Sequence, residues 1–283
     1  IKTIDTNDIR SEGMSWGMTV AVMMNKKSEF DKLWRFAHDR MKLTNGLFPG
    51  TFAWQVKVEG SGVTILDEGA APDGELYMAF ALFNAAGRWG NGSGIFNYEA
   101  QANKLLDTLK NHLMDPQEKQ IVFSPYVNDT TDPSYHIPAF YDFFADVAAS
   151  NNNYWRDAAS ASRTFLSNHF RQTQHGLASY LANFDGTPKT DMGGLTLGNP
   201  GHIYEGDAWR VAMNVGLDAH LSGAKQWHKD ANNALLYFFN SSDSLPANHC
   251  PQGYMQKYHM DGSIYGTCNQ NNWTHGEGQI ATN

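Results

Sequence analysis

Positive charge, cysteine and long apolar runs are all scarce in this sequence of 283 residues. The 21 Lys and Arg residues are outnumbered by 29 Asp and Glu residues, and no basic run occurs that could neutralise a phosphate backbone. Gly, Asn or Pro interrupts every uncharged stretch well before the roughly 20 apolar residues that a membrane-spanning helix needs. We therefore expect neither a nucleic-acid partner nor a membrane partner.

Only 2 cysteines are present, Cys250 and Cys268. They form no CxxC motif, and the 11 histidines show no metal-binding spacing, so we expect no metal and no cofactor. A disulfide between Cys250 and Cys268 in a secreted protein is the preferred interpretation, and two buried free thiols are the alternative. The first residues do not resemble a signal peptide, which fits a mature or trimmed chain.

Apolar residues, by contrast, are plentiful. Hydrophobic residues make up 41% of the chain and aromatic residues 13%, while charged residues make up only 18%. This composition is typical of a globular protein with a continuous core, and no flexible linker divides the chain. We expect a single catalytic domain over residues 1–283, with some of the aromatic rings on loops where sugar rings could stack.

Apolar and amphipathic helices alternate along the chain. Helices that are apolar nearly all round are predicted from Ser11, as N-cap, to Met24, from Pro72, from Pro138 to Val147 and from Ala208 to Leu221. Amphipathic helices are predicted at 28–41, 98–113, 154–170 and 224–239, a hairpin within 43–70, and the start of another helix at 276–283. Buried helices followed by amphipathic ones predict an all-α toroid, an α/α barrel with inner and outer rings.

Three carboxylates, Glu12, Asp73 and Asp207, lie in the first turns of predicted inner helices. Because the inner helices of such a ring run in the same direction, their N-termini lie at one end and would bring the three acids together. Glycoside hydrolysis needs a protonated acid to donate to the leaving oxygen and an ionised one to activate water. The alternative is that the acids only complement helix N-termini, where Asp and Glu are favoured.

A helix N-terminus lowers the pKa of a carboxyl group, whereas a general acid must keep its proton near neutral pH. Burial by Trp16, or repulsion from Asp73, would have to outweigh this effect at Glu12. We therefore predict that Glu12 lies within direct reach of Asp73. Arg210 follows Asp207 at helical spacing, and an ion pair between them would keep Asp207 ionised, as suits a base; an ordinary helix-surface pair is the alternative.

Four motifs in this order resemble those of glycoside hydrolase family 8, and most closely those of its bacterial cold-adapted xylanases. They are SEGMSWGM at 11–18, APDGE at 71–75, SPY at 124–126 with DPSYHIPAFY at 132–141, and DAWRVAMNVGLD at 207–218. The resemblance covers nearly the whole chain. It implies an (α/α)6 barrel and an inverting enzyme that cuts β-1,4 linkages.

Carried over by position, the resemblance assigns roles to six residues. It makes Glu12 the general acid, Asp207 the general base, Asp73 a third carboxylate that contacts the sugar, Tyr135 an active-site tyrosine, Arg210 the partner of the base and Trp54 an aromatic platform. Trp16 is a further substrate-binding candidate. Inversion requires the acid and the base to lie about 6.5–9.5 Å apart, which leaves room for a water molecule.

The chain departs from the family pattern in two ways. A ring of six helical hairpins needs twelve helices, and about nine are predicted, so we expect part of the ring to be missing at each end. Gly206 stands directly before Asp207, where similar enzymes carry a bulkier residue, and a glycine would loosen the backbone that aims the base.

These observations predict an inverting endo-β-1,4-xylanase that is secreted, cold-adapted and monomeric, with xylan or xylo-oligosaccharides as substrate. An exo-oligoxylanase is the first alternative, if a loop within 171–203 or 245–275 closes one end of the cleft. An endoglucanase or a chitosanase of the same family is the second. A non-catalytic carbohydrate-binding relative is the alternative from another class.

Overall fold

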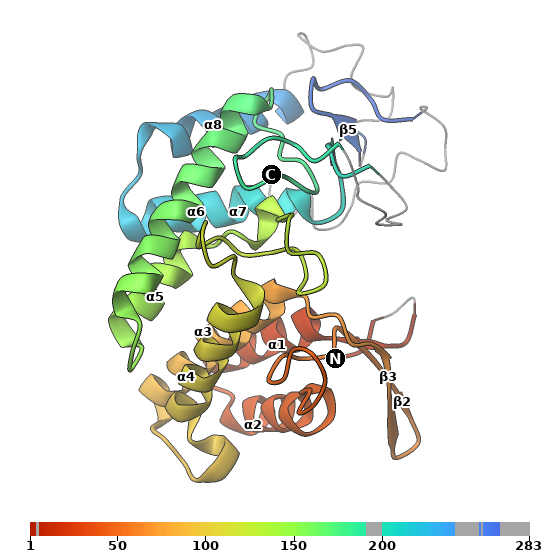
Figure 1. The fold of residues 1–283 in the computed structure, drawn as a ribbon, viewed down its shortest axis with the longest axis vertical. Coiled ribbons are helices and arrows are strands. Elements are labelled where there is room, and N and C mark those ends of the chain that lie inside the picture. Colours follow the sequence, from red (N-terminus) through yellow and green to blue (C-terminus); the bar gives the residue numbers. More distant parts are fainter. Residues whose placement is uncertain (4–5, 191–199, 241–254, 256, 267–283) are drawn as a thin grey trace. The chain divides into compact units, whose positions relative to one another are not determined.

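The computed structural model of the protein describes residues 1–3, 6–190, 200–240, 255 and 257–266 (Figure 1). The chain divides into two compact units. The first comprises Ile1–Gln117, Val122–Asn128 and Phe143–Trp155, and the second comprises Glu118–Ile121, Asp129–Asp142 and Arg156–Asn283.

The first unit is built on packed helices. They are α1 (Ser11–Met23), α2 (Lys27–Phe36), α3 (Pro72–Trp89) and α4 (Tyr98–Thr108). α1 packs against α2 and α3, and α3 packs against α4 (Figure 1). α2 continues into a π-helical turn over Ala37–Met41, α4 into another over Leu109–Leu113, and a short 3-10 helix covers Gly94–Phe96.

The predicted hairpin is present in the first unit. β2 (Gln55–Glu59) pairs antiparallel with β3 (Gly62–Asp67), and β1 (Ile9–Arg10) pairs with the other edge of β2. Gly60, in the turn between β2 and β3, has a φ of 60°, which glycine adopts without the strain of a Cβ atom.

Two expectations for the first helix need correction. The N-cap is Arg10 and not Ser11, because the chain enters α1 directly from β1 with Arg10 in an extended conformation. α1 is also not buried along its whole length. Met14 and Met18 are buried, but Val20 and Met23, towards its end, are 59% and 69% exposed.

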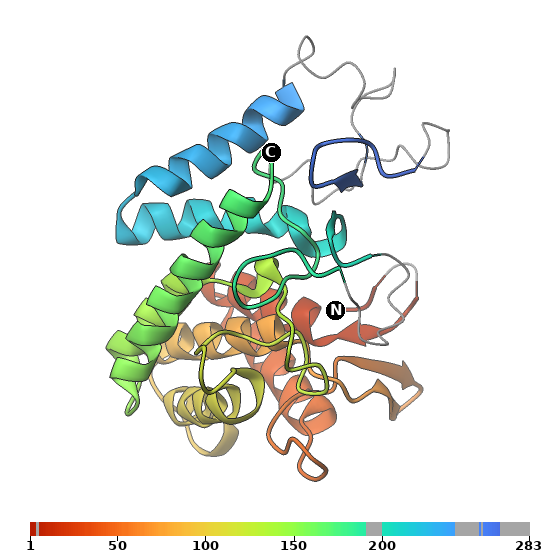
Figure 2. The ribbon, with the colours of Figure 1, turned by 45° about the horizontal axis from the view of Figure 1, so that its top comes forward.

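The second unit holds most of the remaining elements. They are η4 (Pro133–Tyr135), β4 (Ile203–Tyr204), η5 (Gly206–Trp209), α7 (Arg210–Ser222), α8 (Gln226–Asn240) and β5 (Tyr258–His259). α5 (Pro138–Val147) and α6 (Asn152–Gln172) have residues in both units. α7 and α8 lie side by side (Figure 2), and β4 pairs antiparallel with β5. An apolar cluster that includes Leu166, Val215 and Phe238 forms the core of this unit.

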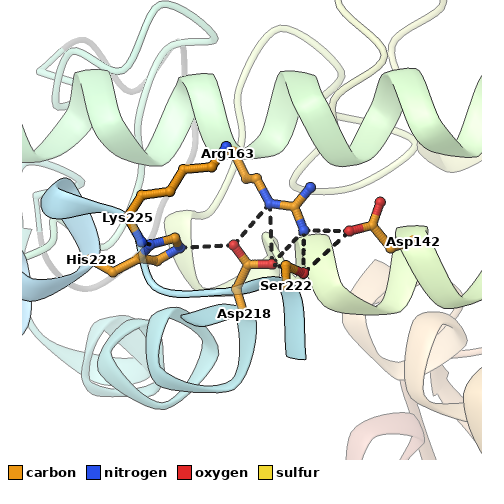
Figure 3. A network of polar contacts seen from close by, with 6 residues as sticks. All are labelled: Asp142, Arg163, Asp218, Ser222, Lys225 and His228. Atoms are coloured by element: carbon orange, nitrogen blue, oxygen red, sulfur yellow. Dashed lines mark hydrogen bonds and ion pairs between the residues drawn. The ribbon is translucent and has the colours of Figure 1, made fainter. Parts of the chain in front are cut away.

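A polar network ties the helices of the second unit together around Asp218 of α7 (Figure 3). Arg163 of α6 donates to Asp218, with Nε 2.9 Å from Oδ2, and also binds Asp142 of α5. His228 of α8 lies 2.9 Å from the same carboxylate through Nε2, while its Nδ1 accepts from the backbone N–H of Lys225. This pattern fixes the proton of the ring on Nε2. Burial opposes the charge of Asp218, but the hydrogen bonds from Arg163 and His228 outweigh it and lower its pKa.

Most predicted elements are confirmed. The helix predicted at 138–147 has the observed bounds of α5, and the helices predicted at 154–170 and 224–239 correspond to α6 and α8 within two residues at each end. Residues 191–199, the predicted helix at 276–283, and Cys250 with Cys268 lie outside the described residues. Within the described part of the chain, no helix is long and apolar enough to cross a membrane.

Candidate active site

Glu12 lies in the first turn of α1, and both of its carboxylate oxygens accept hydrogen bonds. The indole Nε1 of Trp54 donates to Oε1 at 2.9 Å, and the Ser11 hydroxyl donates to Oε2 at 3.1 Å. The backbone N–H of Ser11 in turn donates to the carbonyl oxygen of Trp54 at 3.0 Å. Trp54 therefore holds the start of α1 through its backbone and the Glu12 carboxylate through its side chain.

This donor role of Trp54 was missed by the sequence analysis, which predicted only an aromatic platform. The guanidinium carbon of Arg10 lies 4.8 Å from the centroid of the Trp54 ring, a cation–π arrangement. One face of the ring is thus occupied by Arg10, and the platform role of Trp54 stays a prediction.

The starts of α1 and α3 meet, as expected for two inner helices. A Cβ atom added to Gly74, in the first turn of α3, would lie 3.0 Å from the Ser11 hydroxyl and 3.3 Å from the Glu12 nitrogen. A side chain at this position would require the start of α1 to move by a few tenths of an ångström. Asp73, the residue before Gly74, is fully buried. The contact at Gly74 brings Asp73 to the part of α1 that carries Glu12, whereas their direct contact stays a prediction.

Glu75 is a second buried acid of the same motif, and the sequence analysis overlooked it. Its Oε1 accepts a hydrogen bond from the backbone N–H of Phe52 at 2.9 Å. Burial raises the pKa of Glu75 to about 8; the Phe52 N–H opposes this shift, and the negative charges of Asp73 and Glu12 add to it. Glu75 is therefore protonated at neutral pH. An acid two residues after Asp73, within an otherwise apolar helix, was the signal available in the sequence.

Two aromatic rings pack one helical turn beyond the acids. Trp16 follows Glu12 by four residues on α1, and Tyr77 follows Asp73 by four residues on α3. Their ring centroids are 6.2 Å apart with the planes nearly perpendicular. Because residues four apart share a helix face, the Trp16–Tyr77 pair lies on the faces that carry Glu12 and Asp73. The predicted role of Trp16 in burying Glu12 and binding substrate stays a prediction.

Asp207 lies in the 3-10 turn η5, directly before α7, and not in the α-helix itself. Arg210 Nη2 is 2.7 Å from its Oδ2, so the predicted ion pair is present. The Asp207 side chain is 40% exposed and that of Arg210 is 4% exposed. A buried guanidinium paired with a solvent-accessible carboxylate is more than an ordinary surface pair, because the charge of Arg210 is fixed in place.

Residues of the turn η4 also contact Arg210. Arg210 Nη2 lies 3.2 Å from the Ser134 hydroxyl, and Asn214 of α7 donates to the carbonyl oxygen of Ser134 at 2.7 Å. The Arg210 guanidinium carbon lies 5.8 Å from the ring centroid of Tyr135. The predicted residues Asp207, Arg210 and Tyr135 are thus brought together within the second unit.

Asp132 is another acid that the sequence analysis did not single out. It is fully buried, and its Oδ1 caps η4 by accepting from the Ser134 N–H at 2.7 Å. Burial raises the pKa of Asp132 well above its usual value, and the negative charge of Asp207 adds to this shift, while Arg210 opposes it. An Asp directly before a proline is a common cap, which was the signal in the sequence.

The backbone before Asp207 has the conformation that favours glycine. Gly206 has a φ of 52°, and a Cβ atom there would lie 3.7 Å from the Tyr180 ring, an ordinary contact. Burial raises the pKa of the Tyr180 hydroxyl, and the nearby charges of Asp132, Asp207 and Glu205 raise it further. Gly206 therefore suits its turn, and the expectation that it loosens the base stays a prediction.

The predicted site residues fall into two groups. Glu12, Asp73, Trp54 and Trp16 belong to the first unit, and Asp207, Arg210 and Tyr135 belong to the second. The spacing expected between acid and base therefore stays a prediction. Among the residues that the structure describes, no group of three or more His, Cys, Asp or Glu side chains could hold a metal ion.

Comparisons with known proteins all match this chain to the same family of enzymes. The family model described as glycosyl hydrolases family 8 matches residues 1–279. The reducing-end xylose-releasing exo-oligoxylanase Rex8A of Paenibacillus barcinonensis is 40% identical over 249 residues, which cover 84% of this chain and 62% of that protein. A reducing end xylose-releasing exo-oligoxylanase of Halalkalibacterium halodurans is 37% identical over 286 residues, covering 98% of this chain and 68% of that protein.

Solved structures match over nearly the whole chain. A cold-adapted family 8 xylanase is similar with a TM-score of 0.88 and 47% sequence identity, over 99% of this chain and 70% of that one. The chain thus spans between 62% and 70% of the length of these relatives. With its mostly helical structure it has the fold class of that xylanase, the (α/α)6 barrel with a small β-hairpin region. The described residues contain eight α-helices, and the expectation that part of the twelve-helix ring is missing stays a prediction.

Proposed function

We infer that this chain, since it belongs to family 8 of the glycosyl hydrolases, cleaves β-1,4-xylosidic bonds of xylan with inversion at the anomeric carbon. The observation that carries this proposal is the setting of Glu12. Its carboxylate is held by two donors, and a protonated carboxylic acid, Glu75, lies close enough for its pKa to respond to the charges of Glu12 and Asp73. Relatives that are 37–47% identical to this chain are named xylanase or exo-oligoxylanase, which supports xylan or xylo-oligosaccharides as substrate.

In the proposed reaction Asp207 removes a proton from a water molecule as the water oxygen attacks the anomeric carbon. The bond between that carbon and the linking oxygen breaks, and Glu12 gives its proton to the departing oxygen. Glu12 ends as a carboxylate and Asp207 as an acid, so protons and charge balance. Arg210 holds Asp207 in place, and Asp73 is proposed to contact the sugar at the point of cleavage.

Endo action remains our proposal, and exo action is the second candidate. The names of the two curated relatives favour release of xylose from the reducing end, whereas the solved relative is described only as a xylanase. The products distinguish the two modes. Long xylan cut at random gives a mixture of oligosaccharides with a fast fall in viscosity, whereas exo action on xylotriose gives xylose and xylobiose with little effect on long xylan.

The test of the mechanism compares reducing-sugar release from xylan by the wild type, Glu12→Gln and Asp207→Asn. Each substitution should lower kcat by at least about 100-fold, because general acid or base catalysis contributes about 10²–10⁴-fold. Glu59→Gln is the matched control, since Glu59 is an exposed residue of β2 paired with Lys57. Equal release by the wild type and Glu12→Gln would refute the acid assignment, and a β-anomer as first product, seen by NMR, would refute inversion.

The biological setting belongs to the same proposal. We propose that the protein is secreted, acts as a monomer and is adapted to cold, with xylan or xylo-oligosaccharides as its partner. Sedimentation velocity tests the monomer. The temperature dependence of kcat, measured against that of a relative from a warm habitat, tests the cold adaptation.

A further inference from the structure

The burial of Glu75 costs folding free energy that its contacts do not offset. The side chain is fully buried in α3, and Oε2 has no hydrogen-bond partner among the residues that the structure describes. Oε1 accepts from the Phe52 N–H, and the backbone N–H of Glu75 itself also lies close to the carboxyl group. A buried polar group with unused hydrogen-bonding capacity destabilises a protein, and leucine would fill the space without that cost. A residue that costs stability beside an active site points to a functional role.

The contact of Glu75 lies at one end of a short segment that leads to Glu12. Glu75 holds the backbone N–H of Phe52, and Trp54 follows two residues later. Trp54 then reaches α1 through its indole N–H to Glu12 and its carbonyl oxygen to Ser11. The segment 52–54 therefore connects a side chain of α3 with the catalytic acid on α1.

Two backbone hydrogen bonds also hold the segment 52–54 in place. The N–H of Ala53 donates to the Met41 carbonyl oxygen at 2.8 Å, and the N–H of Trp54 donates to the Gly69 carbonyl oxygen at 3.0 Å. These bonds fix the backbone on both sides of residue 53. Loss of the Glu75 contact should therefore shift the indole by a small amount and should not release the whole segment.

We propose that Glu75 is a positioning residue for the general acid: it fixes the segment 52–54 so that the indole N–H of Trp54 meets Glu12. The proposal rests on the proposed function, in which Glu12 protonates the leaving oxygen. It assigns Glu75 no contact with the sugar.

The charge state of Glu75 fits this role. With a pKa raised to about 8 by burial, Glu75 stays neutral at pH 7 and accepts the Phe52 N–H without adding a negative charge beside Glu12 on α1 and Asp73 on α3. An ionised residue at the same place would repel Asp73 and the carboxylate that Glu12 becomes when it gives up its proton. Two cationic residues lie near the segment: Arg10 stacks over the Trp54 ring, and Lys42 is bridged to Phe52 through the backbone.

The test compares two substrates that differ in their need for an acid. Xylohexaose needs protonation of its leaving oxygen, whereas β-xylobiosyl fluoride loses fluoride without it. Glu75→Leu should lower kcat/KM on xylohexaose about ten-fold, the effect of one weakened hydrogen bond to a charged group, and change the fluoride rate less than about two-fold. Glu75→Gln, which keeps an acceptor for Phe52, should retain most of the xylohexaose activity. Equal losses on both substrates with Glu75→Leu would overturn the proposal.

Two further variants make the result specific. Val56→Ala removes buried methyl groups from β2 and should affect both substrates alike, as a purely structural change does. In a Trp54→Phe background, Glu75→Leu should have little additional effect, because the route to Glu12 is already broken. Full additivity of the two substitutions would overturn the proposal.

Glu12→Gln separates this proposal from the proposed function. It should abolish activity on xylohexaose and spare the fluoride. If Glu12→Gln lowers both rates equally, the acid assignment is wrong; if it shows the split and Glu75→Leu does not, only the role of Glu75 is wrong. If Glu75→Leu does not fold, the role of Glu75 is tested instead on the alkaline side of the pH dependence of kcat/KM on xylohexaose. We expect the wild type to show an ionisation near pH 8 that Glu75→Gln lacks, and an unchanged alkaline side would overturn the proposal.

Discussion

The indole N–H of Trp54 donates to Oε1 of Glu12 at 2.9 Å, although 42 residues separate them along the chain. The ring also carries Arg10 on one face, 4.8 Å from its centroid. Trp54 therefore has a polar role that can be separated experimentally from its proposed role as a platform for sugars.

Trp54→Phe keeps an aromatic ring and loses the indole donor. We expect kcat on xylo-oligosaccharides to fall about ten-fold with little change in KM, because Glu12 becomes charged only as it gives up its proton and a hydrogen bond to a charged group contributes about 1.5–3 kcal/mol. Trp54→Leu should in addition raise KM if the ring binds sugar. Steady-state kinetics of the two variants checks both statements, and a Trp54→Phe enzyme with wild-type kcat would show that the N–H is dispensable.

Gly206→Ala tests the backbone that aims the base. Gly206 has a φ of 52° and Gly60 one of 60°, and neither added Cβ would meet an atom closer than 3.7 Å. Both alanine variants should therefore lose about 1–2 kcal/mol of unfolding free energy from the left-handed backbone. Only Gly206→Ala should also lower kcat, by about ten-fold or more, because it adjoins Asp207. A kcat that rises in Gly206→Ala would instead support the expectation that glycine loosens the base.

Glu75 should make the protein less stable as pH rises. Its pKa is about 8 in the folded state and 4.5 without the surrounding protein, so the folded state binds a proton that the unfolded state releases. The stabilisation is complete below pH 4.5 and is lost as pH rises towards 8, about 3 kcal/mol by pH 7. The difference in unfolding free energy between Glu75→Gln and the wild type should thus shift by about 1 kcal/mol per pH unit in favour of Gln. Urea denaturation at several pH values measures it, and parallel curves would contradict the raised pKa.

Asp218→Asn should destabilise the protein by about 3 kcal/mol or more, because it leaves Arg163 without the buried charge that it binds. Asp230→Asn, on the exposed face of α8, is the matched control and should change stability by less than about 0.5 kcal/mol. Chemical denaturation compares the two. Equal stability of both variants would show that the network in Figure 3 contributes no more than a surface contact.

Elements with strong local signals could be predicted from the sequence. Pro138 and Pro72 mark the starts of α5 and α3, because proline suits the first helical turn, and the hairpin β2–β3 follows from alternating residues around Gly60. The first turns of α1 and α3 were also assigned correctly, and Gly74 shows that these turns meet.

What the sequence did not reveal depends on contacts between distant segments. The capping rule selected Ser11, but pairing of Arg10 with Gln55 extends the chain up to the helix and makes Arg10 the N-cap. Glu75 and Asp132 stood within recognised motifs, yet their importance arises from complete burial and from the charges of neighbouring acids. Neither burial nor these charges can be read from residue spacing.

The three adjacent residues Asp73, Gly74 and Glu75 have different surroundings. Asp73 is fully buried, Gly74 lies close to the start of α1, and Glu75 accepts a hydrogen bond from segment 52–54. A substitution of Gly74 or of Glu75 would disturb a contact with a different part of the chain. Homologous recombination that exchanged α3 alone would separate these partners. We expect functional chimaeras of such enzymes to have their crossovers outside residues 11–75, so that the whole block is inherited together.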